Sequence, residues 1–71
     1  MKHWKPTEEQ LRLAMANLPR EKTMEVQEYL DHNELGLAWE SMQEIADELG
    51  IVTTEFWRPM AMAAGLMMLA K

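Results

Sequence analysis

Apolar and polar positions separate most sharply between Asn33 and Leu49. On a helical wheel the apolar residues of this segment fall within an arc of about 120°. That arc contains Leu35, Ala38, Trp39, Met42, Ile45, Ala46 and Leu49. The opposite side carries Glu40, Glu44, Asp47 and Glu48. The pattern predicts a helix with one buried face and one face of negative potential, in which Leu37 is a single apolar side chain among carboxylates.

Helix-capping and helix-breaking residues predict three more helices and leave no segment for a strand. The first helix starts with Thr7 as its cap, and Pro19 ends it. The second covers about residues 20–31. In the break that follows, we expect Asp31 or Asn33 to accept backbone amide hydrogens of the next helix.

Gly50 stands just past the last apolar residue of the acidic helix and predicts its end. Thr53 or Thr54 caps a fourth helix, which covers about residues 54–69. Pro59 falls one turn inside this helix, so either the first turn is kinked or the regular helix begins near Arg58.

These elements predict an all-α bundle of four short helices. We expect a single domain over residues 1–71, with residues 1–6 as a flexible N-terminal segment. The predicted core consists of Leu11, Met15, Leu18, Val26, Leu30, Leu35, Trp39, Met42, Ile45, Leu49, Phe56, Trp57 and Met60.

The fourth helix is apolar on nearly all sides. A helix of this kind is either central in a bundle or shared with another subunit, and three short helices can hardly surround a fourth. We therefore predict self-association, as a homodimer or as a stable complex through the same face. The residues expected to form this contact are Met62, Leu66 and Leu69.

The formal charge of −5 is unevenly distributed. Between Glu21 and Glu55 the chain has ten acidic residues and a single basic one, Lys22. A surface of this charge repels phosphate backbones and anionic membranes and attracts cationic proteins. The sequence therefore predicts a protein partner with a basic surface, and neither a nucleic acid nor a membrane.

Residues suited to catalysis or to a cofactor are not grouped in the sequence. Ser41 is the only serine and has no histidine at helical spacing, so a hydrolase triad has no support. Adjacent side chains in residues 31–34 point in different directions, which does not suit a metal ion. The chain also lacks cysteine and a glycine-rich phosphate loop. We expect no enzymatic activity, no cofactor and no metal.

No targeting segment is visible in the sequence. No apolar stretch follows Lys2 and Lys5, as it would in a secretory signal. The apolar segment from Met60 to Ala70 is much shorter than the roughly 20 residues that span a bilayer. We therefore expect a cytoplasmic protein.

Two alternative functions stay open. Residues 43–51, with Phe56 ten residues after Ala46, have the glycine and hydrophobic spacing of a helix-turn-helix. A DNA-binding regulator is therefore one alternative, although its second helix would offer Arg58 as the sole basic group. The other alternative is a structural or dimeric protein without a specific partner, whose carboxylates only keep it soluble.

Residues 26–42 (VQEYLDHNELGLAWESM) join an aromatic helix end, an Asp-His-Asn-Glu turn and a Leu-Ala-Trp-Glu-Ser-Met helix. This run resembles the core signature of small helical bacterial proteins that include Maf-type immunity proteins of polymorphic toxin systems. Residues 56–57 and 63–67 resemble the last helix of that group, so the resemblance covers about two thirds of the chain. The methionine-rich fourth helix departs from the pattern. The resemblance implies a protein that binds and neutralises a cognate toxin, with contacts at Glu34, Glu40 and Glu44.

The acidic helix and the resemblance together predict a protein-binding module. We expect an immunity-type inhibitor that neutralises a cognate basic toxin through an acidic helix face. The predicted partner-binding residues are Glu34, Leu37, Glu40, Glu44, Asp47 and Glu48.

Overall fold

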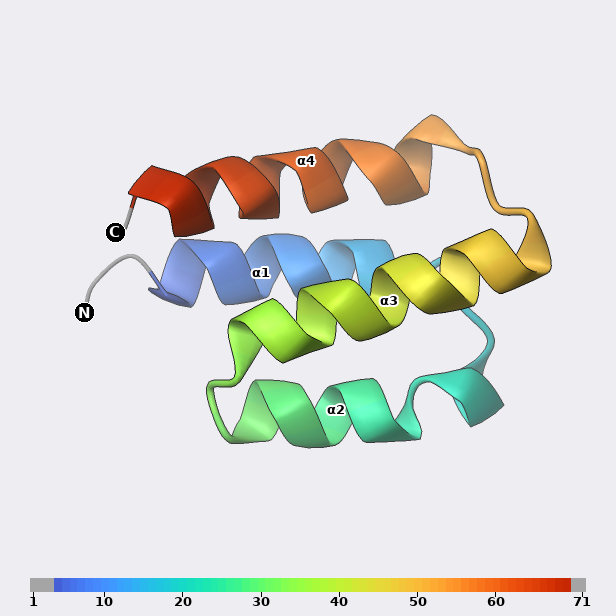
Figure 1. The fold of residues 1–71 in the computed structure, drawn as a ribbon, viewed down its shortest axis with the longest axis horizontal. Helices are drawn as coiled ribbons and strands as arrows, with labels where there is room; N and C mark the ends of the chain where they lie inside the picture. Colours follow the sequence, from blue (N-terminus) through green and yellow to red (C-terminus); the bar gives the residue numbers. More distant parts are fainter. Residues whose placement is uncertain (1–3, 70–71) are drawn as a thin grey trace.

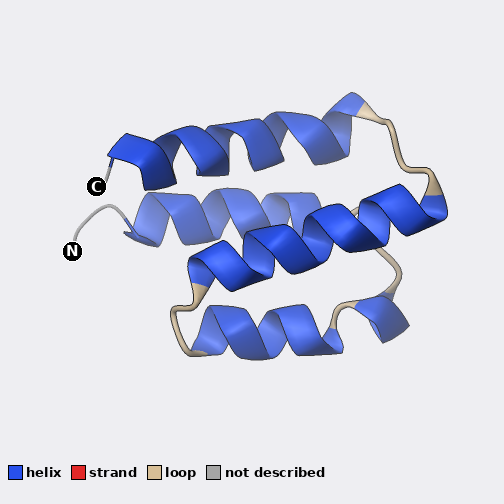
Figure 2. Ribbon diagram, viewed as in Figure 1, coloured by secondary structure: helices blue, strands red, loops and turns tan. Residues whose placement is uncertain are grey.

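The computed structural model describes the backbone of residues 4–69 and the side chains of residues 5–68. Over this range the chain forms four α-helices and no strand (Figure 2). The helices are α1 (Trp4–Met15), α2 (Met24–Asp31), α3 (Leu35–Leu49) and α4 (Thr54–Leu69), and a short 3-10 helix, η1 (Arg20–Lys22), precedes α2. The all-α bundle predicted from the sequence is confirmed.

The first and last helices of the described chain form the most extensive contact of the bundle. Helix α1 lies beside α4 and runs in the opposite direction (Figure 1). Helix α3 packs on α1 and α2, so that α4 and α2 occupy opposite edges of the molecule (Figure 1). This arrangement gives the bundle two edges of different composition.

The core is built from large apolar side chains separated by alanines. Ala14, Ala38, Ala46 and Ala63 are completely buried, and their small size lets the helices approach closely. The large buried residues are Leu11, Leu18, Val26, Leu30, Leu35, Met42, Phe56 and Met60. Trp39, Met15, Ile45 and Trp57 pack partly buried against this core.

The predicted core is wrong at one residue, Leu49. Leu49 lies within the apolar arc of α3 but has 43% of its surface exposed, because it is in the last turn of the helix. The preceding residues of the arc at the same side, Met42 and Ala46, are fully buried. The buried face of α3 therefore ends one turn before the helix does.

The start of the first helix also differs from the prediction. Helix α1 begins at Trp4, and Thr7 is 1% exposed within it, so the predicted cap at Thr7 is wrong. Pro6 is compatible with this earlier start, because the first turn of a helix does not use its backbone N–H groups. Residues 1–3 of the N-terminal segment lie outside the described residues.

The junction between α2 and α3 is closed by the backbone and not by a side-chain cap. Asn33 has a positive φ of 58°, its N–H donates to the carbonyl of Leu30 at 3.1 Å, and the N–H of Glu34 donates to Tyr29 at 2.8 Å. This is the hydrogen-bond pattern of a Schellman motif. Glu34 is the N-cap of α3 and makes no side-chain capping bond. The prediction that Asp31 or Asn33 caps α3 is therefore wrong.

Gly50 ends α3 as the sequence predicts. Its φ is 71°, in the left-handed region that glycine adopts without steric cost. The N–H of Ile51 then donates to the carbonyl of Ala46 at 2.9 Å, which satisfies an oxygen at the end of the helix.

Pro59 lies inside α4, and a side chain that follows the end of α1 replaces the hydrogen-bond donor that proline lacks. In a regular helix the carbonyl of Glu55 accepts from the N–H of residue 59, which proline lacks. The Nδ2 of Asn17 lies 3.1 Å from this same oxygen. The helix therefore runs continuously from Thr54 to Leu69, and the same contact ties the end of α1 to the start of α4.

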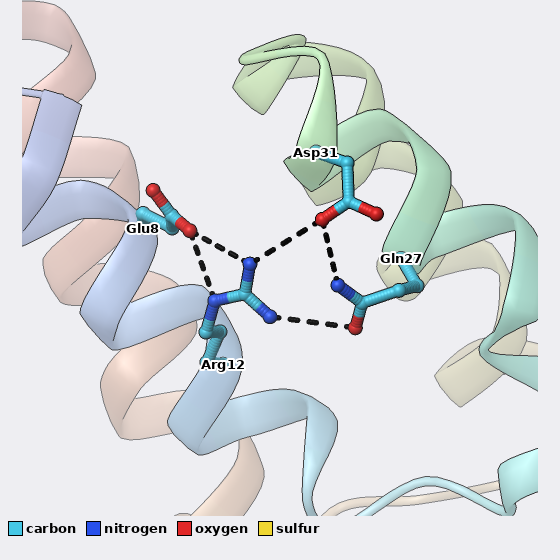
Figure 3. A network of polar contacts seen from close by, with 4 residues as sticks. All are labelled: Glu8, Arg12, Gln27 and Asp31. Atoms are coloured by element: carbon cyan, nitrogen blue, oxygen red, sulfur yellow. Dashed lines mark hydrogen bonds and ion pairs between the residues drawn. The ribbon is translucent and has the colours of Figure 1, made fainter.

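A polar network ties α1 to α2 (Figure 3). The Nη2 of Arg12 lies 2.7 Å from Glu8 Oε2 and 3.8 Å from Asp31 Oδ1. Gln27 accepts a hydrogen bond from Arg12 Nη1 at 3.3 Å and donates one to Asp31 at 2.9 Å. Asp31 is thus used in a tertiary contact and not in helix capping.

Candidate protein-binding surface

The outer surface of α3 carries the predicted partner-binding residues. All of them are exposed, and Leu37 has 48% of its surface accessible. We call this set the acidic face; its members are Glu34, Leu37, Glu40, Glu44, Asp47 and Glu48. On the opposite side of the helix, Ala38, Met42 and Ala46 are fully buried.

The position of the acidic face is fixed by contacts of α3 with its neighbours. The indole Nε1 of Trp39 donates a hydrogen bond to the carbonyl of Met60 in α4 at 2.8 Å. This bond and the alanines buried beneath α3 hold its orientation, because interiors are closely packed. The carboxylates are therefore presented from a rigid helix and not from a loop.

A groove between α3 and the segment of η1 and α2 extends the acidic face. Its volume is about 640 Å³. Glu44 and Glu48 line it from α3, and Ser41 and Ile45 form its inner wall. From the other side it is lined by Glu21, Lys22, Met24 and Glu25. Four carboxylates and one ammonium group thus surround a single groove.

Lys22 neutralises little of the negative charge of the groove. Its Nζ lies 3.7 Å from Glu48 Oε1, and both side chains are exposed, with 42% of the Lys22 side chain and 68% of the Glu48 side chain accessible. An ion pair of this kind is weak in water. Glu21, Glu25 and Glu44 form no ion pair with a described residue, so a cationic side chain entering the groove would find carboxylates available.

Met24 is an apolar residue of this surface that the sequence analysis missed. It has 74% of its surface exposed and lies at the rim of the groove. A sequence pattern cannot place it there, because its position beside α3 depends on how α2 and α3 pack. The signal that the sequence did contain was the run of acidic residues from Glu21 onward.

Charge is divided between the two edges of the bundle. From Arg20 to Leu49 the chain carries nine acidic and two basic residues, a balance of −7. Helices α1 and α4 carry three of each sign and are neutral. The negative potential therefore belongs to the α2 and α3 edge alone.

The residues predicted for self-association are placed differently from one another. Met62 has 53% of its surface exposed, whereas Leu66 is partly buried. Leu69 is the last residue of α4, and its side chain lies outside the described residues. Met62 lines a second groove, between α1 and α4, together with Leu13 of α1, which has 60% of its surface exposed.

The described residues contain no group of three or more histidine, cysteine, aspartate or glutamate side chains arranged to hold a metal ion.

Ser41 lies among carboxylates in the groove between α3 and the segment of η1 and α2. Such an arrangement provides electrostatic attraction and hydrogen-bond acceptors, which suit the binding of a cationic group.

No family model, curated protein or solved structure matches the chain. Within the described part of the chain, none of the helices has the length and apolar character needed to cross a membrane.

Proposed function

We propose that this protein is a binding module that presents the acidic face of α3 to a partner protein with a basic surface. The observation that carries the proposal is the concentration of a −7 balance on the α2 and α3 edge of a bundle whose other edge is neutral. A field of this kind steers cationic proteins toward one side of the molecule and increases their rate of association.

Apolar side chains in the acidic face and in the adjoining groove would supply the part of the binding energy that charge does not. Leu37 and Met24 are 48% and 74% exposed, and both stand among carboxylates. Exposed apolar residues surrounded by polar ones are typical of contact surfaces. In this proposal charge determines how fast the complex forms, and the two apolar side chains determine how slowly it separates.

Within this class we propose an immunity-type inhibitor that neutralises a cognate basic toxin. The proposal rests on the resemblance of residues 26–42 to Maf-type immunity proteins and on the exposed positions of Glu34, Glu40 and Glu44. The acidic face would act by covering a cationic surface that the toxin needs for its own activity.

The test is binding to the product of the neighbouring open reading frame, measured by surface plasmon resonance. The double variant Glu40→Lys with Glu44→Lys should slow association at least tenfold at low salt, because it reverses charge on the acidic face. The control is Glu9→Lys with Glu55→Lys, which changes the net charge equally but lies on α1 and α4. Both double variants are compared as monomers, at protein concentrations where sedimentation equilibrium finds no self-association. Leu37→Ala should instead accelerate dissociation.

Equal slowing by the two double variants would overturn the proposal, since the interaction would then follow net charge and not the acidic face. Absence of binding to that product would remove the immunity-type assignment. A mobility shift of duplex DNA at low salt by the parent protein would favour the DNA-binding alternative instead.

A further inference from the structure

An apolar groove follows the α1 and α4 edge, away from the acidic face. Its volume is about 540 Å³. Leu13 from α1 and Met62 from α4 line it, with 60% and 53% of their surfaces exposed. Pro59, Glu55 and Arg58 also line the groove. Two large apolar side chains thus stand exposed on either side of one groove.

The outer surface of α4 continues this groove as a neutral apolar strip. Ala61, Gly65 and Met68 are exposed at helical spacing, and no charged residue occurs from Met60 to Leu69. A Cβ added at Gly65 would meet no atom within 4 Å. Packing within one molecule therefore does not require glycine here, whereas close approach of a second helix would.

The distribution of charge indicates which occupant fits this edge. Two copies of an acidic chain repel each other where their α2 and α3 edges meet, since each edge carries −7. The α1 and α4 edge carries no net charge. Its exposed charges are balanced: Lys5 and Arg58 are positive, and Glu9 and Glu55 are negative. In a two-fold contact, the positive groups of one copy can face the negative groups of the other.

We propose that a second copy of this chain covers the groove, in a two-fold symmetric homodimer. Helix α4 of each copy contacts α4 of the other across Gly65, with Leu13, Met62 and Met68 filling the interface and the four charged residues at its rim. This inference does not depend on the proposed function. The dimer leaves the α2 and α3 edges free and presents two acidic faces at opposite sides.

The first test is the molar mass in solution, measured by sedimentation equilibrium from about 1 to about 100 µM because dimerisation depends on concentration. The parent protein should approach twice the mass of the chain. Met62→Lys should remain monomeric over this range, since it places like charges opposite each other. Met24→Lys is the matched control, because it changes an exposed methionine on α2, and it should dimerise like the parent.

The second test uses single cysteines, since the chain has none of its own. Under mild oxidation, Gly65→Cys, at the centre of the proposed contact, should form a disulfide-linked dimer at least tenfold faster than Met24→Cys. This test does not require the Met62→Lys variant to fold, and circular dichroism verifies the helix content of each variant. A parent protein that is monomeric at every concentration would overturn the proposal. Loss of dimer in Met24→Lys, persistence of dimer in a folded Met62→Lys, or equal cross-linking of the two cysteines would overturn it too.

Discussion

Replacing Asn17 with alanine should destabilise the fold, because it removes the donor that serves a carbonyl oxygen within α4. The Nδ2 of Asn17 lies 3.1 Å from the oxygen of Glu55, whose usual donor is absent at Pro59. A net intramolecular hydrogen bond contributes about 0.5–1.5 kcal/mol. Asn17 is exposed, so water can take over part of its role, and we expect a loss of about 1 kcal/mol.

The physical reason can be isolated by combining this substitution with Pro59→Ala. Alanine at position 59 restores a backbone N–H that can donate to Glu55 within the helix. Asn17→Ala should then cost almost nothing, although Pro59→Ala alone also changes the packing of a buried ring. The coupling free energy between the two positions should therefore be about 1 kcal/mol, whatever the effect of Pro59→Ala by itself.

Urea denaturation followed by circular dichroism measures the four corners of this cycle. All variants should be compared at one low protein concentration, because any self-association raises the apparent stability. In thermal unfolding, a loss of 1 kcal/mol should lower Tm by about 4–8 °C in a domain of this size. If Asn17→Ala destabilises the Pro59→Ala protein as much as it destabilises the parent, the side chain does not replace the missing donor and the reasoning is refuted.

Three further predictions concern the backbone and the polar contacts, and urea denaturation of dilute protein tests each. Gly50→Ala should destabilise by about 1–2 kcal/mol, since its φ of 71° strains an L side chain, whereas Gly65→Ala should stabilise the monomer by up to about 1 kcal/mol. Trp39→Phe should lose about 1 kcal/mol, because it removes the hydrogen bond to Met60 and keeps an aromatic ring. Arg12→Met should cost about 1 kcal/mol or less, and the cost should fall as salt is added.

Each of these predictions has a result that contradicts it. If Gly50→Ala and Gly65→Ala change the free energy of unfolding in the same direction, backbone conformation does not distinguish the two positions. A Trp39→Phe protein as stable as the parent would show that the indole bond contributes nothing. An Arg12→Met cost that is independent of salt would show that the network in Figure 3 acts through packing and not through charge.

The bounds of α3 and α4 could be predicted almost completely from the sequence. Helix α3 has a sharp apolar arc and a glycine at its end, and both are local signals that the tertiary structure does not change. Thr54 and Leu69 likewise mark α4 where the sequence placed it, despite Pro59. The contact that makes this proline acceptable comes from Asn17, far away in the sequence, and no local pattern reveals it.

The errors occur where backbone geometry or packing replaces a side-chain signal. Threonine is a common N-cap residue, but Thr7 is buried inside α1. Asn33 ends α2 through its left-handed backbone conformation and not through its side-chain amide. The predicted second helix is divided into η1 and α2. Leu49 matches the wheel of α3 but lies beyond the part of the helix that other elements cover.

The candidate surface was predictable as one helix face but not as a groove. The wheel of α3 placed Glu40, Glu44, Asp47 and Glu48 outward, because solvent-exposed positions follow the helical period. The contribution of Glu21, Met24 and Glu25 depends on α2 lying against α3, which is a tertiary contact. The sequence therefore predicted the charge of the surface but not its shape.

The pairing of α1 with α4 has a consequence for the order of folding. These helices share the most extensive contact of the bundle but are separated along the chain by η1, α2 and α3 (Figure 1). Helices α2 and α3 are joined by a short turn and can associate early, because little chain entropy is lost in closing it. The partner of α1 is synthesised only after α3. During translation the contact between α1 and α4 therefore cannot form until α4 leaves the ribosome, and until then the face of α1 that packs on α4 stays without its native cover.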